Sequence, residues 1–274
     1  MWVMNLFEKI LYFLQKEMET PKPYGWFHLI CIFLIIVSVI ILFKLKNKYS
    51  EKQLKTVLFV YGFTAFILEL LKQIVWSFNY DASTNIVTWD YQWYAAPFQL
   101  CTTPIFVSLI CLFLNKNKFR DSLLSYIAYI TILGSFMTVL LPDSCFTRTI
   151  LVNIHTMWLH CGSLVLSVYL LIIGEVKVNK KSLINAFLVF IGFVFIAQSL
   201  NIIIYNSGIL NGEDFNMFYI SPYFTTHLPV YNFVQENFPY IIYFIFYIIS
   251  IGLGSIVIYC LSYLIKYNTL KRRT

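Results

Sequence analysis

Charged residues are scarce in this chain of 274 residues: Asp, Glu, Lys and Arg make up 12% of it, about half the share of a typical soluble domain. Hydrophobic residues make up 59%. They gather in seven stretches of roughly 19 to 28 residues, each long enough to cross the ~30 Å hydrocarbon layer of a membrane. This composition excludes a soluble enzyme, a disordered chain and a secreted module held together by disulfides.

Several motifs are also missing. The six cysteines include no CxxC pair and no spacing typical of a metal site, so we expect neither a metal nor a cofactor. The predicted spans contain no GxxxG motif, and the sequence has no internal repeat. An odd number of spans disfavours a transporter built from two inverted halves. A signal peptide is not expected, because Glu8, Lys9 and Lys16 interrupt the first apolar stretch.

The remaining patterns predict an all-α membrane protein. An amphipathic helix over 1–20 is expected to lie on the outer interface, since apolar residues recur there at helical spacing until Pro21. We expect 21–274 to form one domain of seven transmembrane helices. Their predicted ranges are 25–43, 57–78, 95–114, 123–141, 150–173, 183–205 and 238–265.

The distribution of basic residues predicts the orientation. The connections 79–94 and 206–237 contain no Lys or Arg, and 142–149 contains only Arg148. The alternate loops and the C-terminal tail carry clusters of Lys and Arg. This pattern predicts a multi-pass cell-membrane protein with its N-terminus outside and its C-terminus in the cytoplasm. The net charge of +7 then reflects topology, and we expect no nucleic-acid partner.

The ionisable and amide side chains within the spans share one depth. Counted from the outer end of each span, they lie ~4 to 15 Å deep: His28, His155, Cys101, Gln198, Glu69 and His160. Because polar groups are costly inside a bilayer, this layer predicts a polar cavity that opens to the outer leaflet.

Simpler roles for these residues stay open. Glu69 and Lys72 are three residues apart and could merely neutralise each other. His28 lies near the interface, where a structural role is favoured. His155 and His160 project about 140° apart on their helix, so both cannot point squarely into one pocket.

Cys101 has the most unusual surroundings of the six cysteines. It lies in the segment Ala96-Pro97-Phe98-Gln99-Leu100-Cys101-Thr102-Thr103-Pro104. Pro97 suits a first helical turn, while Pro104 would remove the hydrogen bond to the Leu100 carbonyl and loosen the helix beside the thiol. The alternative is that Cys101, like the other cysteines, is a small apolar packing residue.

Several short segments resemble a known family. Pro97–Cys101 resembles the LPxHxC signature of the YwaF-type integral membrane proteins, and 141–143 is similar to their Thr-Pro-Asp turn. His155–Gly162 resembles their His-rich fifth span. Asn216–Tyr219 and Asn237–Tyr240 are similar to motifs of their last outer loop and last span. The resemblance follows the chain order over most of its length.

The resemblance implies a chemistry, because this family is related to a eukaryotic ether-phospholipid acyltransferase that carries an acyl group on a cysteine. Cys101 would be that nucleophile. Gln99 stands where a histidine is expected in bacterial relatives, so the base would be another histidine. His160 is the first choice and His155 the alternate.

The expected reaction is therefore a phospholipid acyl transfer. Cys101 attacks the ester, and the acyl group passes to a lysophospholipid. Glu69 would orient the histidine, and Gln99 or Asn201 would donate to the oxyanion. The polar residues that we expect to bind or orient the substrate are Gln99, Glu69, Gln198, Asn201, His28 and Asn216. The long aromatic loop 206–240 could form a lid over the cavity.

A different class of function uses the same polar layer. In a non-enzymatic seven-helix receptor or a small-solute carrier, these residues would bind a ligand or relay protons, and Cys101 would be incidental. An assembly factor for other membrane proteins is a third possibility. Replacing Cys101 by Ser separates these classes.

Overall fold

The computed structural model describes residues 4–45, 49–81, 83–142 and 145–271. The start of the expected amphipathic helix (1–3), residue 143 of the Thr-Pro-Asp-like turn and residues 272–274 of the basic tail lie outside these ranges. The helices are α1 (Leu6–Leu14), α2 (Trp26–Leu45), α3 (Glu51–Ser77), α4 (Thr103–Phe113), α5 (Lys118–Tyr126), α6 (Ile132–Leu140), α7 (Ile150–Ile172), α8 (Lys180–Ser207), α9 (Pro229–Asn237) and α10 (Tyr240–Lys271). Strands β1 (Phe78–Asp81) and β2 (Ile86–Trp89) form an antiparallel hairpin.

Six of the described helices are long and apolar enough to cross a membrane. They correspond to six of the seven predicted spans. The fourth span of that prediction is one helical run from Lys118 to Leu140, interrupted by a π-helical turn over Ile127–Thr131. A multi-pass, mostly helical membrane protein is thus confirmed, while the count of seven stays a prediction.

The helix predicted over 95–114 is wrong in its first half. After a 3₁₀ turn at Trp93–Ala95, the chain runs without regular α-helix to Thr102, and α4 covers only Thr103–Phe113. The physical reason is Pro104. It has no N–H, and its ring would collide with the carbonyl of Leu100 in a continuous helix. Proline is favoured in the first helical turn, so the helix begins at this residue rather than crossing it.

The helix near the N-terminus is shorter than the predicted 1–20. Asn5 caps α1, and a reciprocal hydrogen bond between Asn5 and Glu8 completes a capping box. Leu11 is buried against Val75 and Phe78. The Gln15 amide, directly after the helix, donates to the carbonyl of Val75 at 2.7 Å. Since Val75 belongs to α3, α1 is fixed to the end of a membrane helix.

The π-helical turn Ile127–Thr131 lies in the middle of the bundle, and all five of its residues are buried. A π turn displaces a backbone carbonyl from the regular helical ladder. Here the Ile127 carbonyl accepts hydrogen bonds from the Ser167 hydroxyl at 2.8 Å and the Thr131 hydroxyl at 3.0 Å. The turn contacts α7, α8 and α10, and so lies where the helical layers meet.

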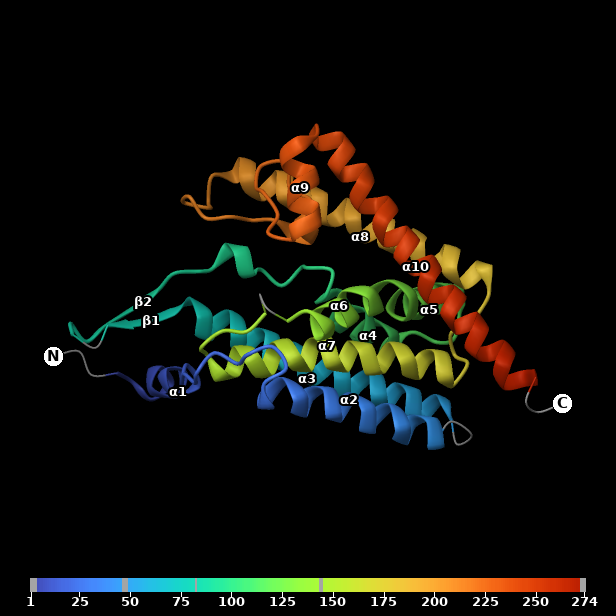
Figure 1. Ribbon diagram of the computed structural model, residues 1–274. Helices are drawn as coiled ribbons and strands as arrows, with labels where there is room; N and C mark the ends of the chain where they lie inside the picture. The colour runs from blue at the N-terminus through green and yellow to red at the C-terminus, as the bar shows by residue number, and fades with distance from the viewer. Residues whose placement is uncertain (1–3, 46–48, 82, 143–144, 272–274) are drawn as a thin grey trace.

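The two ends of the molecule differ in character (Figure 1). The N-terminus, α1 and the β1–β2 hairpin lie at one end, and the C-terminus lies at the other. At the C-terminal end, the buried Arg120 guanidinium holds Glu51 at 2.6 Å and Glu175 at 3.4 Å. Glu175 also accepts from Tyr49 and Lys116. This network joins the starts of α3 and α5 to the α7–α8 turn.

Candidate functional site

A buried polar cluster joins α3 to α7. Its members are Glu69, Lys72, Gln73 and His155, and we call them the Glu69 cluster. One carboxylate oxygen of Glu69 lies 2.8 Å from Lys72 Nζ and accepts from Gln73 Nε2 at 2.7 Å. The other lies 2.7 Å from His155 Nε2. Lys72 and Gln73 also donate to the carbonyl of Ala95, at 3.1 and 2.5 Å.

The charged groups of this cluster are buried, and they pair with one another. The side chains of Glu69, Lys72 and His155 are all less than a tenth exposed. A charge removed from water is tolerated only when it is paired and hydrogen-bonded. Because one carboxylate serves both the ammonium and the imidazole, Glu69 is the central residue of the cluster.

His155 keeps one ring nitrogen available. Its Nε2 faces Glu69, while Nδ1 is buried and has no hydrogen-bond partner among the described residues. His160 lies further along α7, is buried and interacts electrostatically with His155. Both histidines thus lie in one buried region of the bundle, although the 140° between them keeps them on different sides of the helix.

Cys101 lies in the irregular segment before α4 and is a half-buried free thiol. It interacts electrostatically with Lys72 and Glu69. The structure therefore brings Cys101 and the Glu69 cluster into one region. No hydrogen bond joins the Cys101 thiol to His155 or His160 in the part of the chain that the structure describes. Hydrogen bonds between catalytic groups are commonly loose before a substrate binds.

The amides of Gln99 and Asn201 do not face an open cavity. Gln99 donates to the carbonyl of Asn216 at 2.9 Å and accepts from the N–H of Phe218 at 2.8 Å. Asn201 donates to the Met217 carbonyl at 3.0 Å and accepts from the Met217 N–H at 2.7 Å. We call Gln99, Asn201 and Asn216, together with the 3₁₀ turn Met217–Tyr219, the clasp.

Asn216 acts within its own loop. Its side chain accepts from the Ser221 N–H at 2.8 Å and donates to the Phe224 carbonyl at 3.1 Å. All three amides of the clasp thus bind backbone groups of the loop after α8. Asn201 holds this loop to α8, and Gln99 holds it to the segment that carries Cys101.

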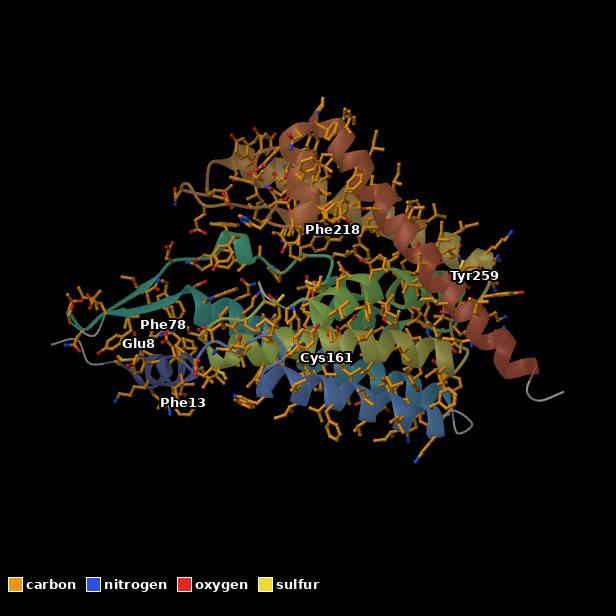
Figure 2. The ribbon with its side chains drawn as sticks, viewed as in Figure 1. Glu8, Phe13, Phe78, Cys161, Phe218 and Tyr259 are labelled. Carbon is orange, nitrogen blue, oxygen red and sulfur yellow. The ribbon has the colours of Figure 1, made fainter. Side chains whose placement is uncertain are left out.

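The clasp holds a backbone conformation that is unusual for side chains of this size. Phe218 and Tyr219 have φ angles of 59° and 58°. Each residue in this left-handed region costs about 1–3 kcal/mol when it is not glycine. A buried hydrogen bond contributes about 1 kcal/mol, so the several bonds of the clasp are comparable with this cost. Phe218 is buried and stacks on Phe98 with ring centres 5.8 Å apart. Figure 2 labels Phe218 between α8–α10, at the top of the view, and the other helices.

Two other predicted site residues lie apart from the Glu69 cluster. His28 accepts from the Tyr24 N–H at 3.0 Å, and its Nε2 lies 3.0 Å from the Val139 carbonyl. These contacts join the start of α2 to the end of α6. Gln198 on α8 interacts with the Tyr240 hydroxyl, and its Oε1 is buried without a partner among the described residues.

The sequence did not predict a site role for Lys72, Gln73 or Tyr219. The spacing of Glu69 and Lys72 did indicate their ion pair, and Gln73 follows on the same helix face. Tyr219 was only part of a motif resemblance. Its side chain interacts electrostatically with Cys101, and this proximity depends on a contact between segments more than a hundred residues apart.

The family comparison covers both the Glu69 cluster and the clasp. The TMEM164 family matches residues 21–259. No curated protein and no solved structure matches the chain. The matched range includes Cys101, both histidines and the turn at Met217–Tyr219, and it covers most of the sequence. The chain therefore belongs to the TMEM164 family.

Proposed function

We propose that this protein is a membrane-embedded phospholipid acyltransferase that carries its acyl group on Cys101. The observation that supports it most directly is the contact of His155 with Glu69 at 2.7 Å, in the same buried region as the Cys101 thiol. A carboxylate that orients an imidazole near a nucleophile is the arrangement of covalent acyl-transfer enzymes. Membership of TMEM164, the ether-lipid acyltransferase family, supports the same reaction class.

In the proposed reaction, His155 takes the proton of the Cys101 thiol. The structure favours His155 over His160 for this role because Glu69 faces His155 directly. The thiolate attacks the ester carbonyl of a phospholipid, and a lysophospholipid leaves as the acyl-thioester forms. A second lysophospholipid then gives its hydroxyl proton to the same imidazole and takes the acyl group. The carbon–sulfur bond breaks, and the Cys101 thiolate takes that proton back from the imidazole. The chemistry that we propose needs no metal or cofactor.

The substrate would enter from the outer leaflet. The predicted orientation puts the hairpin and the clasp on the outside, where the loops lack Lys and Arg. Lysine and arginine gather on the cytoplasmic side of membrane proteins, and the opposite end carries the Arg120 network. In this orientation Cys101 lies toward the outer face of the cell membrane.

Intact-mass spectrometry tests the proposal. The purified protein is incubated with mixed micelles of dihexanoyl phosphatidylcholine, phosphatidylethanolamine and phosphatidylglycerol. We expect one added acyl mass that hydroxylamine removes, and its loss in Cys101→Ser. Cys260→Ser is the control, because Cys260 is exposed on α10, far along the chain from the site. An unmodified wild-type protein, or a Cys101→Ser variant that still turns over lipid, would instead favour the receptor or carrier.

A further inference from the structure

In the clasp, three amide side chains surround one short turn, and two residues of that turn have positive φ angles. Gln99 and Asn201 come from different parts of the fold, and both bind the backbone of Met217–Phe218. Strained backbone persists only when its surroundings enforce it, and it is concentrated at functional sites. This concentration of strain and hydrogen bonds points to a role beyond connecting α8 to α9.

Tyr219 is the last residue of this turn. Its own carbonyl accepts from the Tyr243 hydroxyl, and the carbonyl of the next residue, Ile220, accepts from Tyr240 at 2.7 Å. On its other side, the Phe218 N–H is held by Gln99, which lies two residues before Cys101. The backbone of Tyr219 is thus fixed on both sides, next to the segment that carries the thiol.

We propose that the Tyr219 hydroxyl is the oxyanion donor of the acyl transfer. This inference rests on the proposed function of Cys101. The Tyr219 and Cys101 side chains interact electrostatically. The sequence suggested Gln99 or Asn201 for this role, but their amides hold the turn and so act as positioning residues for Tyr219.

The hydroxyl is suited to donate without losing its proton. Burial raises the pKa of Tyr219 to about 12, and the nearby Cys101 and Cys145 act in the same direction. The phenol therefore stays neutral over the range in which a histidine base works. A preorganised neutral donor stabilises a developing oxyanion and takes up no charge of its own.

In the first transfer, the thiol proton passes to the imidazole as the sulfur attacks the substrate. The Cys101 sulfur bonds to the ester carbon, and the carbonyl π electrons move to the oxygen. This oxyanion accepts a hydrogen bond from Tyr219 Oη. When the carbonyl re-forms, the carbon–oxygen bond to glycerol breaks, and the glycerol oxygen takes the proton that the imidazole had received from the thiol.

The rate of Cys101 acylation in the micelle assay tests this role. Removal of one oxyanion donor lowers the rate about 10²- to 10³-fold, and we expect this for Tyr219→Phe with little change in the half-saturating lipid concentration. Tyr223→Phe, on the same loop and 40% exposed, should stay within about twofold of wild type, since its hydroxyl faces no developing charge. Tyr219→His keeps a donor in a residue that tolerates positive φ, and it should recover part of the loss.

The outcomes separate the two proposals. If the wild type acquires a thioester and Tyr219→Phe acquires it at the same rate, Tyr219 is not the donor and the role of Cys101 stands. If the wild type acquires none, the proposed function itself fails. Thermal midpoints in detergent identify a variant that has merely unfolded. If Tyr219→Phe has unfolded, the folded Tyr219→His variant is measured instead. A Tyr219→His protein that acquires no more acyl mass than Cys101→Ser overturns the donor role.

Discussion

At the scale of single residues, the central feature is the double use of Glu69. Its carboxylate neutralises Lys72 and faces His155, so structural and chemical roles meet in one side chain. The first contact was predictable, because three residues separate the pair on a helix. The second was not, since Glu69 and His155 are 86 positions apart and only the packing of α3 on α7 brings them together.

Replacing Glu69 by Gln tests both roles. The variant leaves the Lys72 ammonium buried without its counter-charge, which costs about 3–5 kcal/mol for a buried pair. We expect a lower thermal midpoint in detergent and a loss of Cys101 acylation of at least about 100-fold, because the histidine loses its orienting carboxylate.

The double variant Glu69→Gln/Lys72→Met separates stability from chemistry. It removes both charges, and the thermal midpoint should return toward the wild-type value because no unpaired charge remains buried. Acylation should stay low. A stable double variant with wild-type acylation would show that Glu69 serves only to neutralise Lys72.

At the scale of elements, the hydrophobic stretches located the long helices, and one proline explains the main error. The expected helix over 95–114 begins only at Thr103 because Pro104 occupies its first turn. The π turn in the middle of the α5–α6 run was also not predictable, since its displaced carbonyl is satisfied by Ser167 from another helix. Both features depend on backbone hydrogen bonds that hydropathy does not report.

Gly162 on α7 lies against Tyr61 of α3. A Cβ atom at this position would lie 2.8 Å from the ring of Tyr61, which is buried. We expect Gly162→Ala to lower the free energy of unfolding by about 1–3 kcal/mol through overpacking. Gly192→Ala on α8 is the matched control, because a Cβ there meets nothing within 4 Å, and helix propensity predicts a gain of up to about 1 kcal/mol.

Thermal unfolding of the two alanine variants in one detergent measures this difference. A lower midpoint for Gly162→Ala alone fits the close contact of α3 and α7. Equal midpoints would mean that Tyr61 moves aside at no cost and that this contact does not fix the distance between the helices.

At the scale of the whole molecule, the orientation in the membrane stays a prediction, which rests on the absence of Lys and Arg from 79–94 and 206–237. The β1–β2 hairpin lies at one end of the molecule with α1, and α5, which carries Arg120, lies toward the other end (Figure 1). The Arg120 network was not predicted, because Arg120 was counted only as one more basic loop residue. Its burial against Glu51 and Glu175 depends on the meeting of three distant segments.

Labelling of introduced cysteines tests the orientation. Ser83 in the hairpin and Lys118 at the start of α5 are both exposed. In intact cells, a membrane-impermeant maleimide should label Ser83→Cys, whereas Lys118→Cys should react only after permeabilisation, since basic loops stay in the cytoplasm. The parent protein gives the background from its own thiols. The reverse pattern would place the proposed site at the inner leaflet.

The clasp also decides how a lipid could arrive. The long connection after α8 has the length of a flap, but Gln99 and Asn201 fasten it to the remainder of the bundle. These hydrogen bonds hold the loop in place, so we expect that it does not open and that no lipid enters through it. A phospholipid would then enter laterally between two helices, and its acyl chains would stay in the hydrocarbon layer throughout. The entrance is to be sought on the lipid-facing sides of the bundle.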